Sequence, residues 1–205
     1  MNSENNLTGF PSIDKPWLKY FSEEELSTPV PEKTVYELIY ENNCDHLTDT
    51  ALEYFKKKIT YKTMFEKIEL TKAALIANRV KKSDNVIMFT SSSPELVYSL
   101  FAICRIGAVA NMINPIFTHE QIIDRVNETD AEIMFVRIQP ILPKLCIKKI
   151  VIISAFDEMP AVTKMVASVK TKKHIPYSDK IVRWRTFISE GKNTNKTTDA
   201  MYEND

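Results

Sequence analysis

Residues 85–114 constrain the fold most, because their pattern is typical of a strand–helix–strand unit. Val86–Phe89 is an apolar run, as expected for a strand that is buried on both faces of a parallel sheet. Ser93 is a helix-capping residue, and the proline and glutamate after it favour the first helical turn. Apolar residues recur at helical spacing as far as Gly107, where the helix is expected to end before Ala108–Ile113 starts a second strand. A right-handed crossover of this kind predicts two parallel strands with the helix over the sheet.

The rest of the chain repeats this alternation of strands and helices. The further elements that we expect are, in chain order, a helix over 34–43, a hairpin of 51–55 and 58–61, a long helix capped by Thr60, a helix over 118–127, strands over 133–136 and 150–153, a helical stripe over 162–169, and an edge strand over 181–184. The predicted fold class is therefore α/β, with a mostly parallel sheet flanked by helices in three layers.

Three regions of the chain differ in composition. Residues 1–33 are polar and carry four prolines, which predicts an irregular amino-terminal segment that packs on the body. Residues 34–188 contain the alternating strands and helices and are expected to form the α/β subdomain. Nearly every residue over 189–205 is polar, so this last region is expected to be a flexible tail.

Composition excludes several classes of function. The chain contains 27 basic residues (lysine and arginine) and 27 acidic residues (aspartate and glutamate), so its formal net charge is zero. A neutral chain has no bulk electrostatic attraction for nucleic acid. No uncharged apolar run approaches the roughly 18 residues of a membrane span, and the polar start does not resemble a secretory signal. The three cysteines are widely spaced, which predicts buried free thiols. We therefore expect a cytoplasmic protein without a nucleic-acid partner or a membrane span.

Glycine is scarce in this chain. It occurs three times, at positions 9, 107 and 191, where typical usage predicts roughly fourteen. Loops that cradle phosphates need glycine so that several backbone N–H groups can converge on one anion. The sequence contains no Walker loop and no GxGxxG motif. We therefore expect that this chain alone binds no cofactor, ATP included, by such a loop.

Three consecutive serines are the candidate anion site. Ser91, Ser92 and Ser93 stand between an expected strand end and helix start, where hydroxyl groups and the helix dipole can receive an anion. The alternative is that they only cap the helix and form a polar turn, which the missing glycines favour. The three histidines lie in polar segments without metal-site spacing, so no metal site is predicted. No catalytic residue is identified, since no serine lies in the GxSxG elbow that would expose it as a nucleophile.

Four short phrases occur in a specific order and spacing. They are Ile59-Thr60-Tyr61, Ser93-Pro94-Glu95, Ile106-Gly107-Ala108-Val109 and Ile113-Asn114-Pro115. Together they resemble the amino-terminal part of AMP-forming acyl-CoA synthetases, members of the adenylate-forming, luciferase-like superfamily. The resemblance covers most of the chain and implies the amino-terminal subdomain of the adenylate-forming fold. Two features depart from the family pattern: Ser83 stands where a glycine is usual, and the connection between the strands at 136 and 150 is short.

The resemblance also implies an activity for the parent protein. Such a ligase joins a carboxylic acid to CoA through an acyl-AMP, with ATP and Mg²⁺, as in fatty acid metabolism. The family's Ser/Thr/Gly-rich phosphate loop and carboxy-terminal lysine are not found in this sequence. We therefore expect a fragment that is inactive alone. The alternative is a non-catalytic interaction module derived from such an enzyme.

Site residues and partners follow from the same resemblance. Asn114, Thr118 and Arg125 match positions near CoA in the acetyl-CoA synthetase branch. The alternative is an ordinary strand-to-helix turn, in which Pro115 forces Asn114 to be extended. The expected partners are the small-molecule acid and CoA of the intact enzyme and its missing carboxy-terminal part. Since relatives cover this sheet with a second sheet, an uncovered apolar face is expected to cause self-association.

Overall fold

The computed structural model describes residues 8–29, 31–114, 116–136, 144–154, 158–160, 175 and 177–192. The chain divides into two compact units, Met1–Lys33 and Thr34–Asp205. The helical stripe predicted over 162–169 lies outside the described residues.

The first unit contains three short helical elements, α1 (Pro11–Asp14), η1 (Pro16–Tyr20) and α2 (Glu23–Ser27). Proline opens α1 and η1, because its fixed φ suits the first helical position. Ser22 opens α2 in a capping box with Glu25. The segment that we expected to be irregular therefore contains helical turns, each of which begins at a proline or a capping serine.

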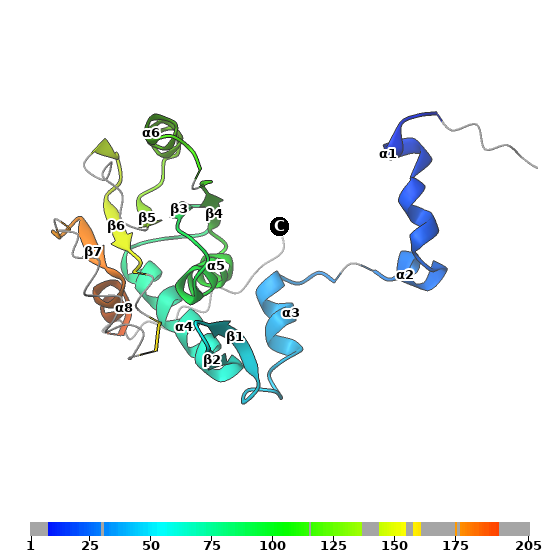
Figure 1. Cartoon of the computed structure of the whole chain (residues 1–205), viewed down its shortest axis with the longest axis horizontal. Helices are drawn as coiled ribbons and strands as arrows, with labels where there is room; N and C mark the ends of the chain where they lie inside the picture. The colour runs from blue at the N-terminus through cyan, green and yellow to red at the C-terminus, as the bar shows by residue number, and fades with distance from the viewer. Residues whose placement is uncertain are drawn as a thin grey trace, which may run out of the picture. The chain divides into compact units, whose positions relative to one another are not determined.

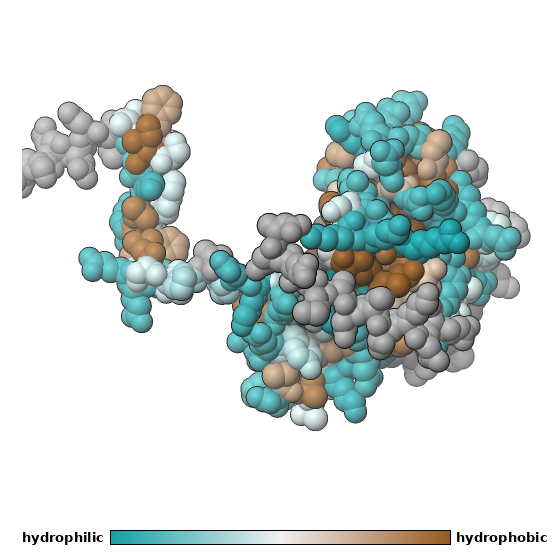
Figure 2. Space-filling view, turned by 180° about the vertical axis from the view of Figure 1, so that it is seen from behind, coloured by the Kyte–Doolittle hydropathy of each residue, from teal (hydrophilic) through white to brown (hydrophobic). Residues whose placement is uncertain are grey.

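Local hydrogen bonds also order the start of this unit. Thr8 and Gly9 donate their backbone N–H groups to the carboxylate oxygens of Asp14, at 2.8 and 2.9 Å. These bonds, with a third from the Thr8 hydroxyl, hold the pKa of Asp14 below its ordinary value. The large apolar side chains of the unit are exposed, Phe10 and Tyr20 among them, and Figure 2 shows hydrophobic surface along the segment. The predicted packing of the segment on the body stays a prediction.

The second unit starts with α3 (Val35–Glu41), a hairpin of β1 (Thr50–Tyr54) and β2 (Lys57–Thr60), and the long helix α4 (Tyr61–Ala77). The hairpin and the capping of α4 by Thr60 are confirmed. The turn between the strands is Phe55-Lys56, one residue earlier than predicted. Both residues have positive φ, 49° and 65°, as a two-residue turn requires when its twist matches that of the strands.

Within the described residues, five strands form one parallel sheet in the order β4–β3–β5–β6–β7 (Figure 1). In chain order they are β3 (Asn85–Phe89), β4 (Val109–Met112), β5 (Ile133–Val136), β6 (Lys149–Ile152) and β7 (Ile181–Arg183). Every neighbouring pair is parallel. The predicted α/β class is confirmed, and the antiparallel hairpin forms a small sheet of its own.

Helices cover both faces of this sheet. The helices α4, α5 (Pro94–Ile106) and α8 (Trp184–Lys192) pack on one face, and α6 (His119–Glu128) packs on the other (Figure 1). Side chains along β5 alternate between the two faces, so that Phe135 joins the first cluster and its neighbour Met134 joins the second. The three predicted layers are therefore present. None of the helices in the described part is long and apolar enough to span a membrane.

The end of the sheet corrects one prediction. The chain leaves β7 at Arg183 and turns directly into α8, which continues to Lys192. The polar tail predicted from Ser189 is therefore wrong for its first four residues, and the remainder lies outside the described part of the chain. The reason is that α8 is amphipathic, and it buries Trp184 and Phe187 against the sheet while its polar residues face outward.

Gly191 sets the contact between α8 and α4. A Cβ atom at this position would lie 2.5 Å from the backbone nitrogen of Ala74. Because no real Cβ approaches that closely, the helices meet backbone to backbone only where glycine stands. A residue that looked like part of a solvated tail is thus buried between two helices.

Candidate functional site

The strand order places a topological switch point beside β3. From β3 the chain passes through α5 to β4 on one side, and then through α6 to β5 on the other side of β3. The chain leaves β3 toward β4 on one side and leaves β5 toward β6 on the other side, so the two connections diverge at the carboxyl ends of β3 and β5. Ligands of open parallel sheets bind in the crevice at this position. A ligand site is therefore expected at the residues that follow Phe89, the last residue of β3.

Ser91, Ser92 and Ser93 follow β3 at this switch point. The Ser93 side chain is buried, and its Oγ accepts the Leu96 N–H at 3.4 Å, which confirms the predicted cap of α5. Ser91 and Ser92 are exposed. Pro94 lacks an N–H group, so the helix start offers one donor fewer than usual. Anion binding by the serines stays a prediction. Because Ser93 caps the helix, the anion would be bound by Ser91, Ser92 and the backbone N–H groups at the start of α5.

Asn114 and Thr118 both belong to the connection between β4 and α6. Asn114 Oδ1 accepts the Ile116 N–H at 3.1 Å, which closes a local turn after β4. Thr118 and Gln121 form the predicted capping box, with bonds of 3.0 and 3.3 Å. Asn114 Oδ1 and the Thr118 hydroxyl are therefore engaged in building the turn and the helix end.

Arg125 lies apart from this turn. It belongs to the last turn of α6, about 10 Å along the helix axis from Thr118. Its side chain is 66% exposed and lies 3.6 Å from Glu128. The three residues that the resemblance placed near CoA thus share one helix and its preceding turn, but they do not converge on one point.

A buried polar stripe on α5 was missed in the sequence. Glu95, Tyr98 and Ser99 have no exposed surface, and Tyr98 Oη and Ser99 Oγ make no hydrogen bond in the described structure. Burial, followed by the negative charges of Glu158 and Glu95, raises the pKa of Tyr98 far above its ordinary value. The sequence does contain a sign of this stripe, because its three polar residues are spaced at i, i+3 and i+4 and therefore share one helical face. The spacing of the apolar residues, which predicts the helix, does not indicate this polar face.

Glu158, which lies beyond the carboxyl end of β6, ties three elements together. Its carboxylate oxygens lie 2.6 Å from the Lys57 ammonium on β2 and 3.7 Å from that of Lys67 on α4. The Glu158 side chain is only 13% exposed, so it is the better shielded partner in both pairs. This carboxylate links the hairpin, α4 and the segment after β6 at the carboxyl side of the sheet.

A cavity of about 530 Å³ lies at the opposite, amino-terminal edge of the sheet. Its charged lining is mixed, and much of it is already paired. Asp84 accepts the Lys81 N–H at 2.8 Å, and Lys148 pairs with Glu132. Within the described residues, no group of three or more His, Cys, Asp and Glu side chains is arranged to hold a metal ion. This edge therefore offers no concentrated charge for a ligand.

The chain matches the family described as AMP-binding enzyme over residues 40–201. Because this match covers most of the 205 residues, the chain belongs to that family. The predicted resemblance to acyl-CoA synthetases is confirmed by relatives that carry those names.

Two curated relatives show the extent of the likeness. The long-chain-fatty-acid–CoA ligase of Bacillus subtilis is 23% identical over 185 residues, which are 85% of this chain and 33% of the ligase. The acetyl-coenzyme A synthetase of Helicobacter acinonychis is 30% identical over 138 residues, which are 63% of this chain and 20% of the synthetase. The chain thus spans a third or less of the length of these relatives.

Solved structures agree on the architecture. The anthranilate CoA ligase AuaEII, solved in complex with anthranoyl-AMP, is 25% identical to this chain with a TM-score of 0.55. The match covers 62% of this chain and 27% of the ligase. The coronafacic acid ligase of Pectobacterium brasiliense has a TM-score of 0.59 and is 15% identical. That match covers 77% of this chain and 29% of the ligase. The second likeness shows the fold alone.

Proposed function

We propose that this chain supplies the amino-terminal α/β portion of an ATP-dependent acyl-CoA ligase. The reaction joins a carboxylic acid to CoA through an acyl-AMP, with release of pyrophosphate and AMP. The observation that carries the proposal is the family match over residues 40–201, together with the relatives named as CoA ligases and synthetases. The doubly wound sheet supports it, because its switch point is the position where such a fold receives ligands.

The chemistry needs more groups than this chain carries. At the switch point, the candidate groups for binding a phosphate are the α5 terminus and the exposed residues Ser91 and Ser92. An exposed helix terminus contributes about 0.3–1 kcal/mol to anion binding, which corresponds to less than a tenfold gain in affinity. Removing even one preorganised donor for a developing charge costs an enzyme about 10²–10³ in rate. We therefore propose that residues 1–205 alone make no acyl-AMP and bind ATP at most weakly, and that ATP, Mg²⁺ and CoA act in the full-length enzyme.

Arg125 is the member of the proposed CoA group that is best able to contact a ligand. The polar groups of Asn114 and Thr118 already accept backbone N–H groups. The Arg125 guanidinium is largely exposed and has one long contact, to Glu128. A guanidinium can hold a phosphate oxygen pair in a bidentate manner. We therefore expect Arg125 to contact a CoA phosphate in the intact ligase, while Asn114 and Thr118 shape the turn at the other end of α6.

A chimera tests the proposed function. This chain replaces the matching third of the Bacillus subtilis ligase, and pyrophosphate release is measured with acetate, fatty acids and anthranilate. We expect the chain alone to match the blank and the chimera to release pyrophosphate only with ATP and an acid. In the chimera, Arg125→Gln should raise the KM for CoA without changing pyrophosphate release, whereas the control Arg79→Gln should change neither.

The competing interpretation is a non-catalytic interaction module. A chimera that unfolds cooperatively like the parent ligase, yet releases no pyrophosphate with any acid, would favour that interpretation. A chain that by itself catalyses ATP-dependent pyrophosphate release would contradict both.

A further inference from the structure

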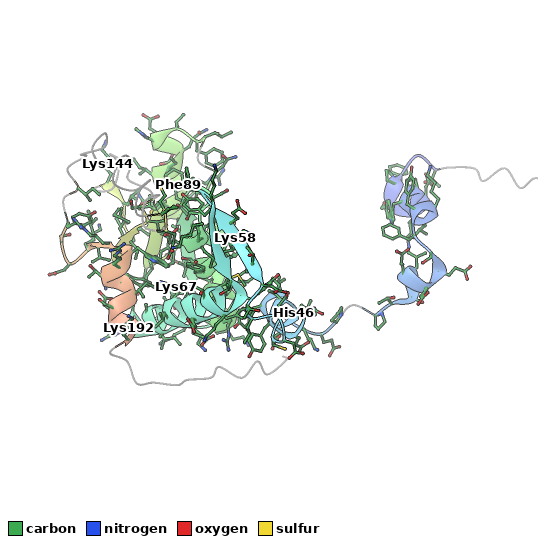
Figure 3. All side chains as sticks on the ribbon, turned by 60° about the horizontal axis from the view of Figure 1, so that its bottom comes forward. His46, Lys58, Lys67, Phe89, Lys144 and Lys192 are labelled. Carbon is green, nitrogen blue, oxygen red and sulfur yellow. The ribbon has the colours of Figure 1, made fainter. Side chains whose placement is uncertain are left out.

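The strand β4 lies at one end of the parallel sheet. Its one neighbour among the described strands is β3, and β1 and β2 form a separate antiparallel sheet (Figure 1). Figure 3 shows Phe89, the last residue of β3, in this part of the molecule. Within the described residues, the outer edge of β4 is therefore not paired with another strand.

The hydrogen bonds of β4 show which of its backbone groups point outward. Val109 and Ile113 donate their N–H groups to carbonyl oxygens of the β3 segment, at 2.9 and 3.0 Å. In a parallel pair every second residue bonds to the same neighbour, so Asn111 also faces β3. The N–H and C=O groups of the residues between them, Ala110 and Met112, therefore point to the open edge.

The open part of this edge has defined ends. Before it, the Ala108 N–H bonds to the Ile103 carbonyl at the end of α5, at 3.1 Å. After it, the Asn114 carbonyl accepts the Phe117 N–H at 3.2 Å. The backbone beyond each end is thus engaged in a helix end or a turn. A partner strand can therefore pair with the outward groups of Ala110–Met112, which are two N–H and two C=O groups.

The surface around this edge is apolar and uncharged. Four large apolar side chains in or just after β4 are exposed, by 49, 58, 84 and 37%: Val109, Met112, Ile116 and Phe117. No lysine, arginine, aspartate or glutamate occurs between Arg105 and Glu120. Edge strands commonly avoid pairing with other chains through charged residues or proline, and β4 itself contains neither. A second copy presents the same uncharged strip, so two copies can approach here without repulsion between like charges.

We propose that two copies of this chain pair through β4 as antiparallel strands, with a two-fold axis at Asn111. In this register Ala110 of each copy lies opposite Met112 of the other, and all the outward N–H and C=O groups of both strands are bonded. Asn111 lies opposite its own copy in a non-hydrogen-bonded pair, where its side-chain amide can bond to the other amide. The pairing uses the edge of the sheet rather than its uncovered face, and it does not depend on the ligase reaction.

The exposed apolar side chains match each other in this arrangement. On the α5 face, Met112 of one copy lies over Ala110 of the other. Ile116 and Phe117 follow the carboxyl end of β4, which antiparallel pairing places beside Val109 of the second copy. This strip is much smaller than a standard interface, to which each partner contributes roughly 20–30 residues. We therefore expect a weak dimer that forms only as the concentration rises.

Sedimentation of the complete chain measures the dimer. The average mass should rise from one chain toward two between micromolar and millimolar concentration. Asn111→Lys places two like charges opposite each other on the axis, so it should weaken the dimer about fivefold or more, as should Asn111→Glu. An equimolar mixture of the two variants should restore the dimer, because the opposed charges then attract. Ser189→Lys, at an exposed position of α8, is the matched control and should dimerise like the original chain.

Cysteine variants test the register. Asn111→Cys places two thiols directly opposite each other, with Cβ atoms about 4.5–5.5 Å apart, which is near the geometry of a disulfide. Mild oxidation with diamide should therefore join two chains through this position. Met112→Cys is the control, because its two copies are diagonal neighbours about 7–8 Å apart and should cross-link much less. The original chain, with its three cysteines, gives the background level.

Three results would overturn the proposal. They are a chain that stays monomeric up to millimolar concentration, a dimer that neither charged variant at Asn111 weakens, and a Met112→Cys chain that cross-links as strongly as Asn111→Cys. The second result would place the association on another surface, such as the sheet face. Circular dichroism checks that each variant is folded, and recovery of the dimer in the mixture excludes misfolding as the cause of its loss. None of these results changes the pyrophosphate assay of the chimera, so this proposal and the proposed function fail independently.

Discussion

The two faces of the parallel sheet are covered in different ways. On one face α4, α5 and α8 enclose a cluster with an aromatic centre, in which the Phe135 ring lies 5.8 Å from that of Trp184 and 5.4 Å from that of Phe187. On the other face, within the described residues, α6 contributes Ile122 and Val126 to a mainly aliphatic cluster.

This difference shows where the tertiary contacts of the second unit are concentrated. The three-helix face joins elements from across the sequence, from α3 to α8, whereas in the described part of the chain α6 is the one helix that packs on the other face. Among the described residues, the edge-to-face ring pairs of the sheet core lie on the first face, where they add to the effect of burial. We therefore expect the first face to dominate the free energy of unfolding. The expected self-association through an uncovered face stays a prediction.

The largest effect is expected from a matched pair on β5. Phe135 and Met134 are adjacent, fully buried, and point to opposite faces. Phe135→Ala should lower the free energy of unfolding by about 3–5 kcal/mol, and Met134→Ala should lower it by about 2–3 kcal/mol. Denaturant unfolding at equilibrium measures both. Equal losses, or a larger loss at Met134, would contradict the comparison.

The next effect concerns the contact between helices. Gly191→Ala introduces a Cβ that would lie 2.5 Å from the Ala74 nitrogen, so α8 must move away from α4. The expected loss in free energy of unfolding is about 1–3 kcal/mol. Ser189→Ala, at an exposed position of the same helix, should change it by less than about 0.5 kcal/mol. If the two variants have the same stability, the helices do not meet as closely as described.

Removing one helix cap on each face of the sheet provides a further comparison of the two faces. Ser93→Ala on α5 and Thr118→Ala on α6 each remove a side-chain acceptor of a backbone N–H, at a cost of about 1 kcal/mol. We expect Thr118→Ala to raise amide hydrogen exchange mainly within α6, since few of the described elements pack on that helix. The effect of Ser93→Ala should spread over α4 and α5, because these helices share one cluster. Exchange that rises equally everywhere in both variants would remove this distinction.

The smallest effect at neutral pH is expected at Tyr98. Its pKa is raised in the folded chain, chiefly by burial. Above about pH 10 the unfolded chain loses the phenol proton while the folded chain retains it, so the free energy of unfolding falls as the pH rises. Tyr98→Phe should leave stability near its original value at pH 7 and should reduce the alkaline loss. The exposed Tyr20→Phe should leave the alkaline loss unchanged, and an unaltered pH profile in Tyr98→Phe would refute the assignment.

The sequence by itself determined the features that depend on near neighbours. The caps at Thr60, Ser93 and Thr118, the end of α5 at Gly107 and the alternation of strands and helices all rest on contacts within about four residues. Hence the α/β class and the position of the serines after β3 could be predicted. The resemblance supplied the ligase family, which neither composition nor periodicity contains.

Only the tertiary structure decided what depends on distant contacts. The tie between Lys57 and Glu158 spans 101 positions, and the burial of Gly191 requires Ala74 of another helix. The placement of β5 beside β3, which creates the switch point, is also set by packing on both faces. A helix such as α8, with a polar second half, reads as a tail until its partner is known. Such features follow from which surfaces meet, and this is a property of the whole fold rather than of any local segment.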